Sequence, residues 1–289
     1  MSKTIHAKLG VVCATLALLT AGTWHVANAD GLNDLIGKDL RVIGLTDDGR
    51  LVSFRALLPQ RTRDLGDVSG LQSTDTALVG IDFRVQDGKL YGVGNGGGVY
   101  TIDPQTAAAT FVNALTVPLD GTIFGVDFNP AADRLRIISD TGQNLAHNVN
   151  DGGMTAANAT LTYTAPLATP VPASGVTAAA YTNNDLNQPD TGTTLFDLDT
   201  MQDQVAIQSP PGNGILVATG KLGVDAAAAA GFDIYSLLSK GVTVANFPFA
   251  TLGVNGTYRF YAINPTTGQA LSLGRLDKAV VDIAIPLSQ

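Results

Sequence analysis

Four aspartates recur at one position of a repeated sequence unit. Asp82, Asp127, Asp233 and Asp282 each stand in a short apolar run, as in LVGIDF and IFGVDF. If these runs are equivalent strands around one axis, the four carboxylates lie at one height beside it. Such a ring could collect Ca²⁺, which takes about six to eight oxygen ligands. The alternative is that each carboxylate accepts backbone N–H bonds from the neighbouring unit, and it is favoured because a residue repeated in every unit is usually fold-determining.

A second group of oxygen-bearing side chains follows the degenerate copy of the unit. It comprises Asn183, Asn184, Asp185, Asn187 and Asp190. The group could hold Ca²⁺, but its spacing differs from the twelve-residue calcium loop, and the chain contains no Glu to supply that loop's bidentate ligand. An Asx-rich turn is the favoured interpretation.

Nucleophilic and zinc catalysis find little support in the sequence. His147 is the single histidine after residue 29, and it follows Ser139 and Asp140 without a nucleophile-elbow motif. We expect a surface or turn histidine there, and one histidine cannot build a zinc site of several His or Cys ligands. Arg134 and Arg136 alternate along a predicted strand, where ion pairs with Asp133 and Asp140 are favoured over anion recognition.

The spacing of the repeat predicts the architecture that positions these residues. With Ala180 standing in the aspartate position of the degenerate copy, the positions 82, 127, 180, 233 and 282 are separated by 45, 53, 53 and 49 residues. A four-stranded propeller blade takes about 40–50 residues. The sequence therefore predicts an all-β fold, a propeller-like ring of about five four-stranded blades.

The two ends of the chain predict how the ring closes. Residues 42–54 form outer strands with no inner strand before them, whereas residues 280–285 form an inner strand with nothing after it. We expect the C-terminal strand to pair into the N-terminal blade, because this removes two exposed strand edges. One segment, Val224 to Leu238, contains an alanine run that favours helix, but its alignment with the repeat predicts a strand over its second half.

Composition agrees with an all-β fold and limits the partners. The chain of 289 residues has 32 Gly and no Glu, and its net charge is −8. Such a chain is poor in helix formers and rich in turn formers. Its acidity disfavours nucleic acid and anionic membrane surfaces as partners.

The N-terminus has the pattern of a signal peptide. Lys3 and Lys8 precede an apolar run of about a dozen residues, and Ala27-Asn28-Ala29 offers a cleavage site before Asp30. The run is too short to span a bilayer, and Cys13 lies inside it, where lipid attachment is not expected. We expect residues 1–29 to be removed, leaving a single domain over 30–289 with a net charge of −10, secreted or periplasmic and without a membrane anchor.

The segments IGLTDDGRLVSF, LVGIDFR with DGKLYGV, and GVDFNPAADRLRIIS resemble an exported bacterial domain family of unknown function, DUF4394. The resemblance covers about residues 40–286. It implies a propeller-like fold and an exported location, and it brings no established activity and no catalytic residues.

Two functional hypotheses remain open. The leading one is a non-catalytic binding or scaffold module for an extracellular protein or polysaccharide, since the repeats are regular and no catalytic constellation is evident. The alternative is a propeller hydrolase, lactonase-like or glycosidase-like, with Asp and Asn residues and a divalent metal at the channel mouth. Metal dependence separates the two.

Overall fold

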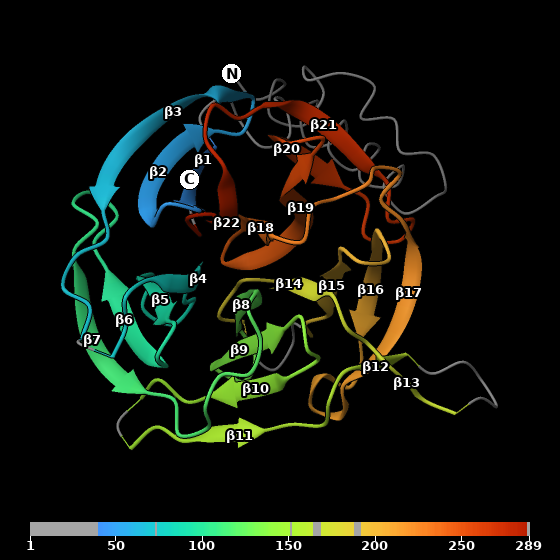
Figure 1. The fold of residues 1–289 in the computed structure, drawn as a ribbon, viewed down its shortest axis with the longest axis horizontal. Helices are drawn as coiled ribbons and strands as arrows, with labels where there is room; N and C mark the ends of the chain where they lie inside the picture. The colour runs from blue at the N-terminus through green and yellow to red at the C-terminus, as the bar shows by residue number, and fades with distance from the viewer. Residues whose placement is uncertain (1–39, 73, 151, 164–168, 188–191, 288–289) are drawn as a thin grey trace, which may run out of the picture.

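The chain folds into five sheets, antiparallel apart from one short strand pair, that are arranged as blades around a central axis (Figure 1). This is a computed structural model, and it describes residues 40–72, 74–150, 152–163, 169–187 and 192–287. The predicted five-bladed β-propeller is confirmed. The leader at 1–29 and Asp190 lie outside the described residues.

Each blade runs from an inner strand at the axis to an outer strand at the rim. The first blade has the order β22-β1-β2-β3, and the second has β4-β5-β6-β7. Their strands are β22 (Val280–Ala284), β1 (Arg41–Thr46), β2 (Arg50–Arg55), β3 (Leu58–Asp67), β4 (Leu78–Phe83), β5 (Leu90–Gly94), β6 (Gly98–Ile102) and β7 (Ala109–Ala114).

The third blade has the order β8-β9-β10-β11, and the fifth has β18-β19-β20-β21. Their strands are β8 (Phe124–Asn129), β9 (Arg134–Ser139), β10 (Asn144–His147), β11 (Thr155–Ala157), β18 (Ala230–Ser239), β19 (Val242–Val254), β20 (Thr257–Ile263) and β21 (Ala270–Arg275). The strand predicted for the second half of 224–238 is β18, and the residues of this segment that precede it, 224–229, are not helical.

The fourth blade departs from the four-stranded pattern. Its own strands are β14 (Val176–Tyr181), β15 (Leu195–Asp199), β16 (Gln204–Gln208) and β17 (Ile215–Lys221), with the 3-10 turn η1 (Pro211–Asn213) between the last two. The short strands β12 (Thr162–Tyr163) and β13 (Val171–Pro172) extend it, with β12 parallel to β17. Strands of two residues are too short to show a period in the sequence.

The ring closes through its last strand, as expected from the unpaired ends of the repeat. β22 pairs antiparallel with β1, with Gly44 opposite Ile283 and Leu45 opposite Asp282. The first blade therefore combines the two ends of the described chain (Figure 1). No helix in the described part of the chain is long and apolar enough to span a membrane.

The hydrophobic core is divided among the blade interfaces. Between the fifth and first blades, Phe260 packs edge-on against Phe54 and stacks on Phe249, with ring centroids 5.1 and 5.2 Å apart. These side chains belong to one buried cluster with residues of both blades. Burying large aromatic side chains between sheets stabilises the contact between neighbouring blades.

Glycines on three inner strands let the neighbouring blades approach closely. Gly80, Gly125 and Gly231 each lie two residues before a repeated aspartate. A Cβ atom on Gly125 would lie 2.7 Å from the Ala178 Cα of the next blade, and one on Gly231 would lie 2.7 Å from the Asp282 Cα. A methyl group has no room at these positions, so glycine sets the distance between inner strands.

We predict that Gly125→Ala destabilises the protein. Its new methyl group meets backbone rather than a flexible side chain, so the blades must shift, and overpacking of this kind costs about 1–3 kcal/mol. For a domain of this size each kcal/mol lowers the melting temperature by about 2–4 °C. Gly192→Ala is the matched control, because nothing lies within 4 Å of that Cβ position. Equal melting temperatures for the two variants would contradict the packing argument.

Candidate functional site

The repeated aspartates form a chain of hydrogen bonds from blade to blade. Asp282 accepts the Ile81 N–H at 2.7 Å, and Asp82 accepts the Phe128 N–H at 2.7 Å. Asp127 accepts the Tyr181 N–H at 3.0 Å, and Asp233 accepts the Ile285 N–H at 2.5 Å. Each bond joins one inner strand to the next blade in the ring or, for Asp233, to the residue just after β22. These central aspartates thus satisfy backbone donors that would otherwise be buried without a partner.

The fourth blade has Ala180 in place of the aspartate, and other groups connect it to the fifth. Ile234 comes directly after Asp233, in the position that Phe128 has after Asp127. Its N–H is not accepted by a residue of the fourth blade but by Asp233 itself, at 2.5 Å. Asn184 donates its side-chain amide to the Ile234 carbonyl at 2.9 Å. Asp185 accepts both the N–H and the hydroxyl of Thr243.

The Asn183–Asn187 group therefore joins two blades. Asn183 donates its backbone N–H to the Asn246 side-chain oxygen, and the Asn246 side-chain amide donates to the Asn183 side-chain oxygen. Asn187 donates its N–H to Asp185 within an Asx turn. Among the described residues of the group, both Asp185 carboxylate oxygens and the Asn183 side-chain oxygen, which could have bound Ca²⁺, accept protein N–H and O–H groups.

Burial and mutual repulsion raise the pKa values of the central aspartates. Asp82, Asp127 and Asp233 each place one carboxylate oxygen within 4.8 Å of those of the other two, and all three are buried. Burial, and then the neighbouring negative charges, raise the pKa of Asp82 and Asp127 well above the usual value. Burial raises the pKa of Asp233 to about 7 and raises that of Asp282 well above its usual value. Close, buried carboxylates cannot all ionise readily without a counter-charge.

Two chemistries can neutralise this cluster, shared protons or a bound cation. The cluster brings three oxygens together, fewer than the six to eight that Ca²⁺ takes, so a bound ion would need further ligands. Protons need no further ligand, and the hydrogen bonds from the neighbouring blades remain in place. The geometry favours the structural role of the aspartates.

The structure does not assemble a Ser-His-Asp triad. His147 is fully buried, and its ring nitrogens contact the Thr155 hydroxyl at 3.0 Å and the Asn113 side-chain oxygen at 2.9 Å. Burial, with the positive charge of Arg134, lowers the pKa of His147 to about 4. The Ser139 hydroxyl bonds to Thr141 instead. The expectation of a surface histidine is wrong, because β10 carries the ring into the space between β7 and β11.

The predicted ion pairs of Arg134 and Arg136 are also wrong. Arg134 is exposed and donates to the carbonyls of Ala132 and Asp133. Arg136 is buried and bonds to Asn144, the Leu145 carbonyl and Tyr181. The Asp133 carboxylate pairs with Arg84 of the second blade at 2.6 Å. Arg136 is not available to these aspartates because its guanidinium contacts Tyr181 of the next blade.

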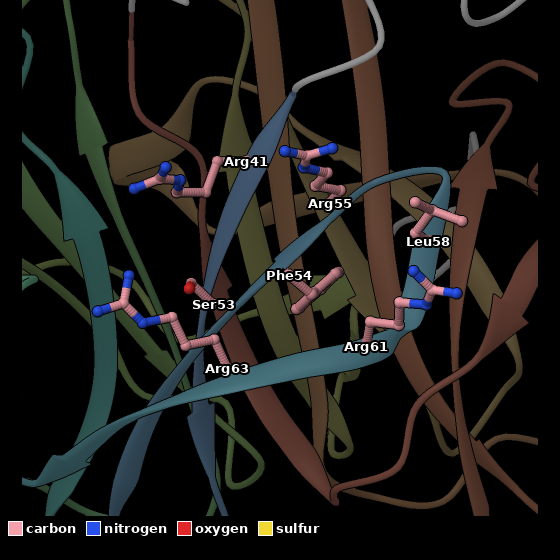
Figure 2. Close-up of a pocket in the computed structure, with 7 residues that line it drawn as sticks. All are labelled: Arg41, Ser53, Phe54, Arg55, Leu58, Arg61 and Arg63. Atoms are coloured by element: carbon pink, nitrogen blue, oxygen red, sulfur yellow. The ribbon is translucent and has the colours of Figure 1, made fainter.

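A pocket on the first blade gathers four arginines. It has a volume of about 400 Å³, and it is lined by Arg41, Ser53, Phe54, Arg55, Leu58, Arg61 and Arg63. We call it the arginine pocket. Figure 2 shows the guanidinium groups of Arg41 and Arg63 on one side of Ser53 and those of Arg55 and Arg61 on the other.

Strand register brings these arginines together. Arg41 on β1 lies directly opposite Arg55 on β2, and Ser53 on β2 lies opposite Arg63 on β3. Arg61 and Arg63 are two positions apart on β3, and side chains at that spacing share one face of a strand. All four arginines are exposed, whereas Ser53 and Phe54, which also line the pocket, are buried, with the Phe54 ring packed against Phe260.

Not every arginine of this blade is available to a ligand. Arg50 pairs with Asp64 at 2.8 Å and with Asp67 at 2.5 Å. Among the described residues, by contrast, Arg61 and Arg63 make no ion pair. Guanidinium groups present donors in a fork that matches carboxylate, sulfate or phosphate. The pocket can therefore bind an anion.

Sequence reasoning about motifs missed this pocket. Five of the ten arginines of the chain lie within residues 41–63, in a protein whose net charge is −8. That local excess of positive charge is the signal that could have revealed it.

The fold and the pocket define a five-bladed β-propeller with a positively charged pocket on its first blade. The sequence model of the domain family of unknown function DUF4394 matches residues 50–284, and the chain belongs to this family. The resemblance found in the sequence motifs is thereby confirmed. No curated protein matches the chain.

Two solved bacterial structures are similar at low identity. An auxiliary nutrient binding protein from Bacteroides ovatus is 12% identical, with a TM-score of 0.42 over 73% of this chain and 56% of its own length. A structural genomics protein of unknown function from Bacteroides thetaiotaomicron is 11% identical, with a TM-score of 0.44 over 86% of this chain and 67% of its own. The chain thus spans little more than half of the first of these proteins.

We predict that Asp127→Ala and Asp127→Asn change the pH dependence of stability alike and differ from each other by one hydrogen bond. Both remove the carboxyl group that titrates. Alanine also removes the acceptor of the Tyr181 N–H, so it should be less stable than the asparagine variant by about 1–3 kcal/mol at every pH. Because the folded pKa values of the central aspartates are raised, their contribution to stability is complete below the unfolded pKa of about 3.9 and is lost as pH rises through the folded values, about 7 for Asp233.

The wild-type melting temperature should therefore fall as pH rises from about 6.5 through the Asp233 value of about 7, and it should fall less for Asp127→Asn. The window starts at about pH 6.5 because His147 acts in the opposite sense below it, where its depressed pKa makes stability decline as pH falls. Added CaCl₂ should leave the wild type unchanged. A calcium-dependent rise in melting temperature that Asp127→Asn abolishes would instead assign the cluster to a cation.

Proposed function

We propose that the protein is an exported, non-catalytic binding module that holds an anionic extracellular ligand in the arginine pocket. One observation carries this proposal, which is the convergence of four exposed arginines on one pocket of an acidic chain. A volume of about 400 Å³ lies within the range of small-ligand pockets, about 300–1,000 Å³. The ligand is a molecule, or part of a polysaccharide or protein, that presents negative charge.

The central aspartates support binding over hydrolysis. A glycosidase needs two carboxylates that flank the bond to be cleaved. Asp82, Asp127 and Asp233 are at most 6% exposed, and each has an oxygen committed to a backbone N–H. A sugar ring cannot reach carboxylates that are packed among five inner strands.

The negative net charge of the protein limits which anions can bind in the pocket. A polyanion as long as nucleic acid would meet the acidic surface beyond the pocket and be repelled, whereas a compact anion meets the arginines alone. Binding should therefore be selective for short acidic ligands and should weaken with salt, because the guanidinium groups are exposed.

We predict that small anions stabilise the protein by binding in the arginine pocket and not at other exposed arginines. Sulfate and citrate should raise the melting temperature at low ionic strength, since a ligand that binds only the folded state stabilises it by mass action. Arg61→Ala/Arg63→Ala should abolish that rise. The control is Arg259→Ala/Arg275→Ala, which removes two exposed arginines that face each other across β20 and β21 and do not line the pocket. No rise in the wild type, or equal loss in both variants, would refute the proposed function.

Export gives a separate prediction. The signal-peptide pattern of residues 1–29 supports cleavage after Ala29, so protein recovered from the periplasm or medium should begin at Asp30. Edman sequencing or intact-mass measurement of the recovered protein tests this. Material that retains Met1, or that carries lipid on Cys13, would contradict secretion as a free protein.

A further inference from the structure

A buried carboxylate on the fourth blade receives no hydrogen bond from the protein. Asp197 lies on β15 and is fully buried, and no group in the described part of the chain donates to either of its carboxylate oxygens. The side-chain oxygen of Gln208 on β16 is buried in the same way, without a protein donor. Buried polar atoms in native proteins nearly always have a partner, so each of these three oxygens needs one.

Strand register places the three oxygens on the face of the fourth blade that meets the third blade. Asp197 lies opposite Ala179 on β14 and Ala206 on β16, and both alanines belong to a buried cluster that also contains a residue of the third blade. Leu195 lies opposite Gln208, so Gln208 is the diagonal neighbour of Asp197 on this face, about 7–8 Å away along the sheet. The alanines on both neighbouring strands are too small to cover the Asp197 carboxylate from its own blade.

A hydrogen-bond network from the third blade reaches Gln208. Arg136 of β9 donates to the Asn144 side-chain oxygen at 2.7 Å, and the Asn144 amide donates to the Pro211 carbonyl at 3.0 Å. The Gln208 amide donates to the same Pro211 carbonyl at 2.5 Å. Because its nitrogen is held by Pro211, the Gln208 amide cannot turn to donate to Asp197.

The buried charges around Asp197 do not balance. Asp197 and Asp199 are two positions apart on β15 and share a face, and both are fully buried. Asp199 accepts the Tyr163 hydroxyl and the Gln202 N–H, each at 2.8 Å. Burial raises the pKa of Asp197 well above its usual value, and the positive charge of Arg136 offsets part of that rise. Two carboxylates and one guanidinium group leave one negative charge without compensation.

We propose that Asp197 and Gln208 bind one monovalent cation, Na⁺ or K⁺, between the third and fourth blades. Carboxylate and amide oxygens are ligands for hard cations. One positive charge balances the region, whereas a divalent cation would leave an excess of positive charge beside Arg136. Water supplies hydrogen-bond donors but no charge, and a proton on Asp197 supplies one donor for three oxygens. A cation can contact all three, and this site is separate from the arginine pocket.

Melting temperatures in different chloride salts test the proposal. At equal ionic strength, NaCl or KCl should give a higher melting temperature than choline chloride, whose cation is too large for a buried site. At a cation concentration about ten times Kd, the ratio of folded to unfolded protein rises about tenfold, which raises the melting temperature by about 3–6 °C. The comparison of NaCl with KCl identifies the cation. Equal melting temperatures in all three salts would overturn the proposal.

Two variants assign the effect to the proposed ligands. Asp197→Asn should abolish the difference between salts, and in choline chloride it should melt at or above the wild-type temperature, because an uncompensated buried charge is costly. Gln208→Met, which removes the second ligand, should reduce the difference and decides the question if Asp197→Asn does not fold. The control Asp127→Asn changes a buried aspartate at the axis and should retain the full difference. A full difference between salts in Asp197→Asn or in Gln208→Met would show that the cation binds elsewhere and would overturn the proposal.

Discussion

The close contact between neighbouring inner strands is the constraint on which the propeller depends. Five sheets that meet at one axis bury the backbone N–H groups of their inner strands, and every such donor needs an acceptor. The repeat meets this need with two residues. A glycine such as Gly125 lets the next inner strand approach, and the aspartate two positions later, Asp127, accepts an N–H from that strand. The apolar side chains between the blades then pack at the distance that these two residues set.

Carboxylates at the axis repel one another, and the sequence reduces this repulsion by omitting one of them. Asp82, Asp127 and Asp233 are close enough to repel one another, and burial opposes their ionisation. A fifth carboxylate would add to this repulsion. The fourth unit has Ala180 at that position, and Asp233 and the Asn184 amide form the hydrogen bonds of the junction instead. The irregular unit is thus consistent with the electrostatics of the ring.

The features that could be predicted from the sequence are those that the residues of a single repeat unit determine. The spacing of the aspartates gave five blades, and the unmatched ends at 42–54 and 280–285 gave the closure by β22. Features built by several units were not predictable. His147 is buried because Asn113 and Thr155 reach its ring from other strands. The arginine pocket depends on the register of three strands, which opposes Arg41 to Arg55 and Ser53 to Arg63, and no single stretch of sequence encodes that register.

The closure by β22 has a consequence for the order in which the protein can fold. Asp282 bonds to Ile81, a residue 201 positions earlier, and β22 is the inner strand of the blade that begins at Arg41. During synthesis the second blade can form as soon as its four strands are available, whereas the first blade lacks its inner strand until residues 280–284 have been made. Contacts this distant in sequence slow folding. The nascent chain therefore carries an unfinished sheet edge until β22 has been made, and the ring cannot close before that strand is available.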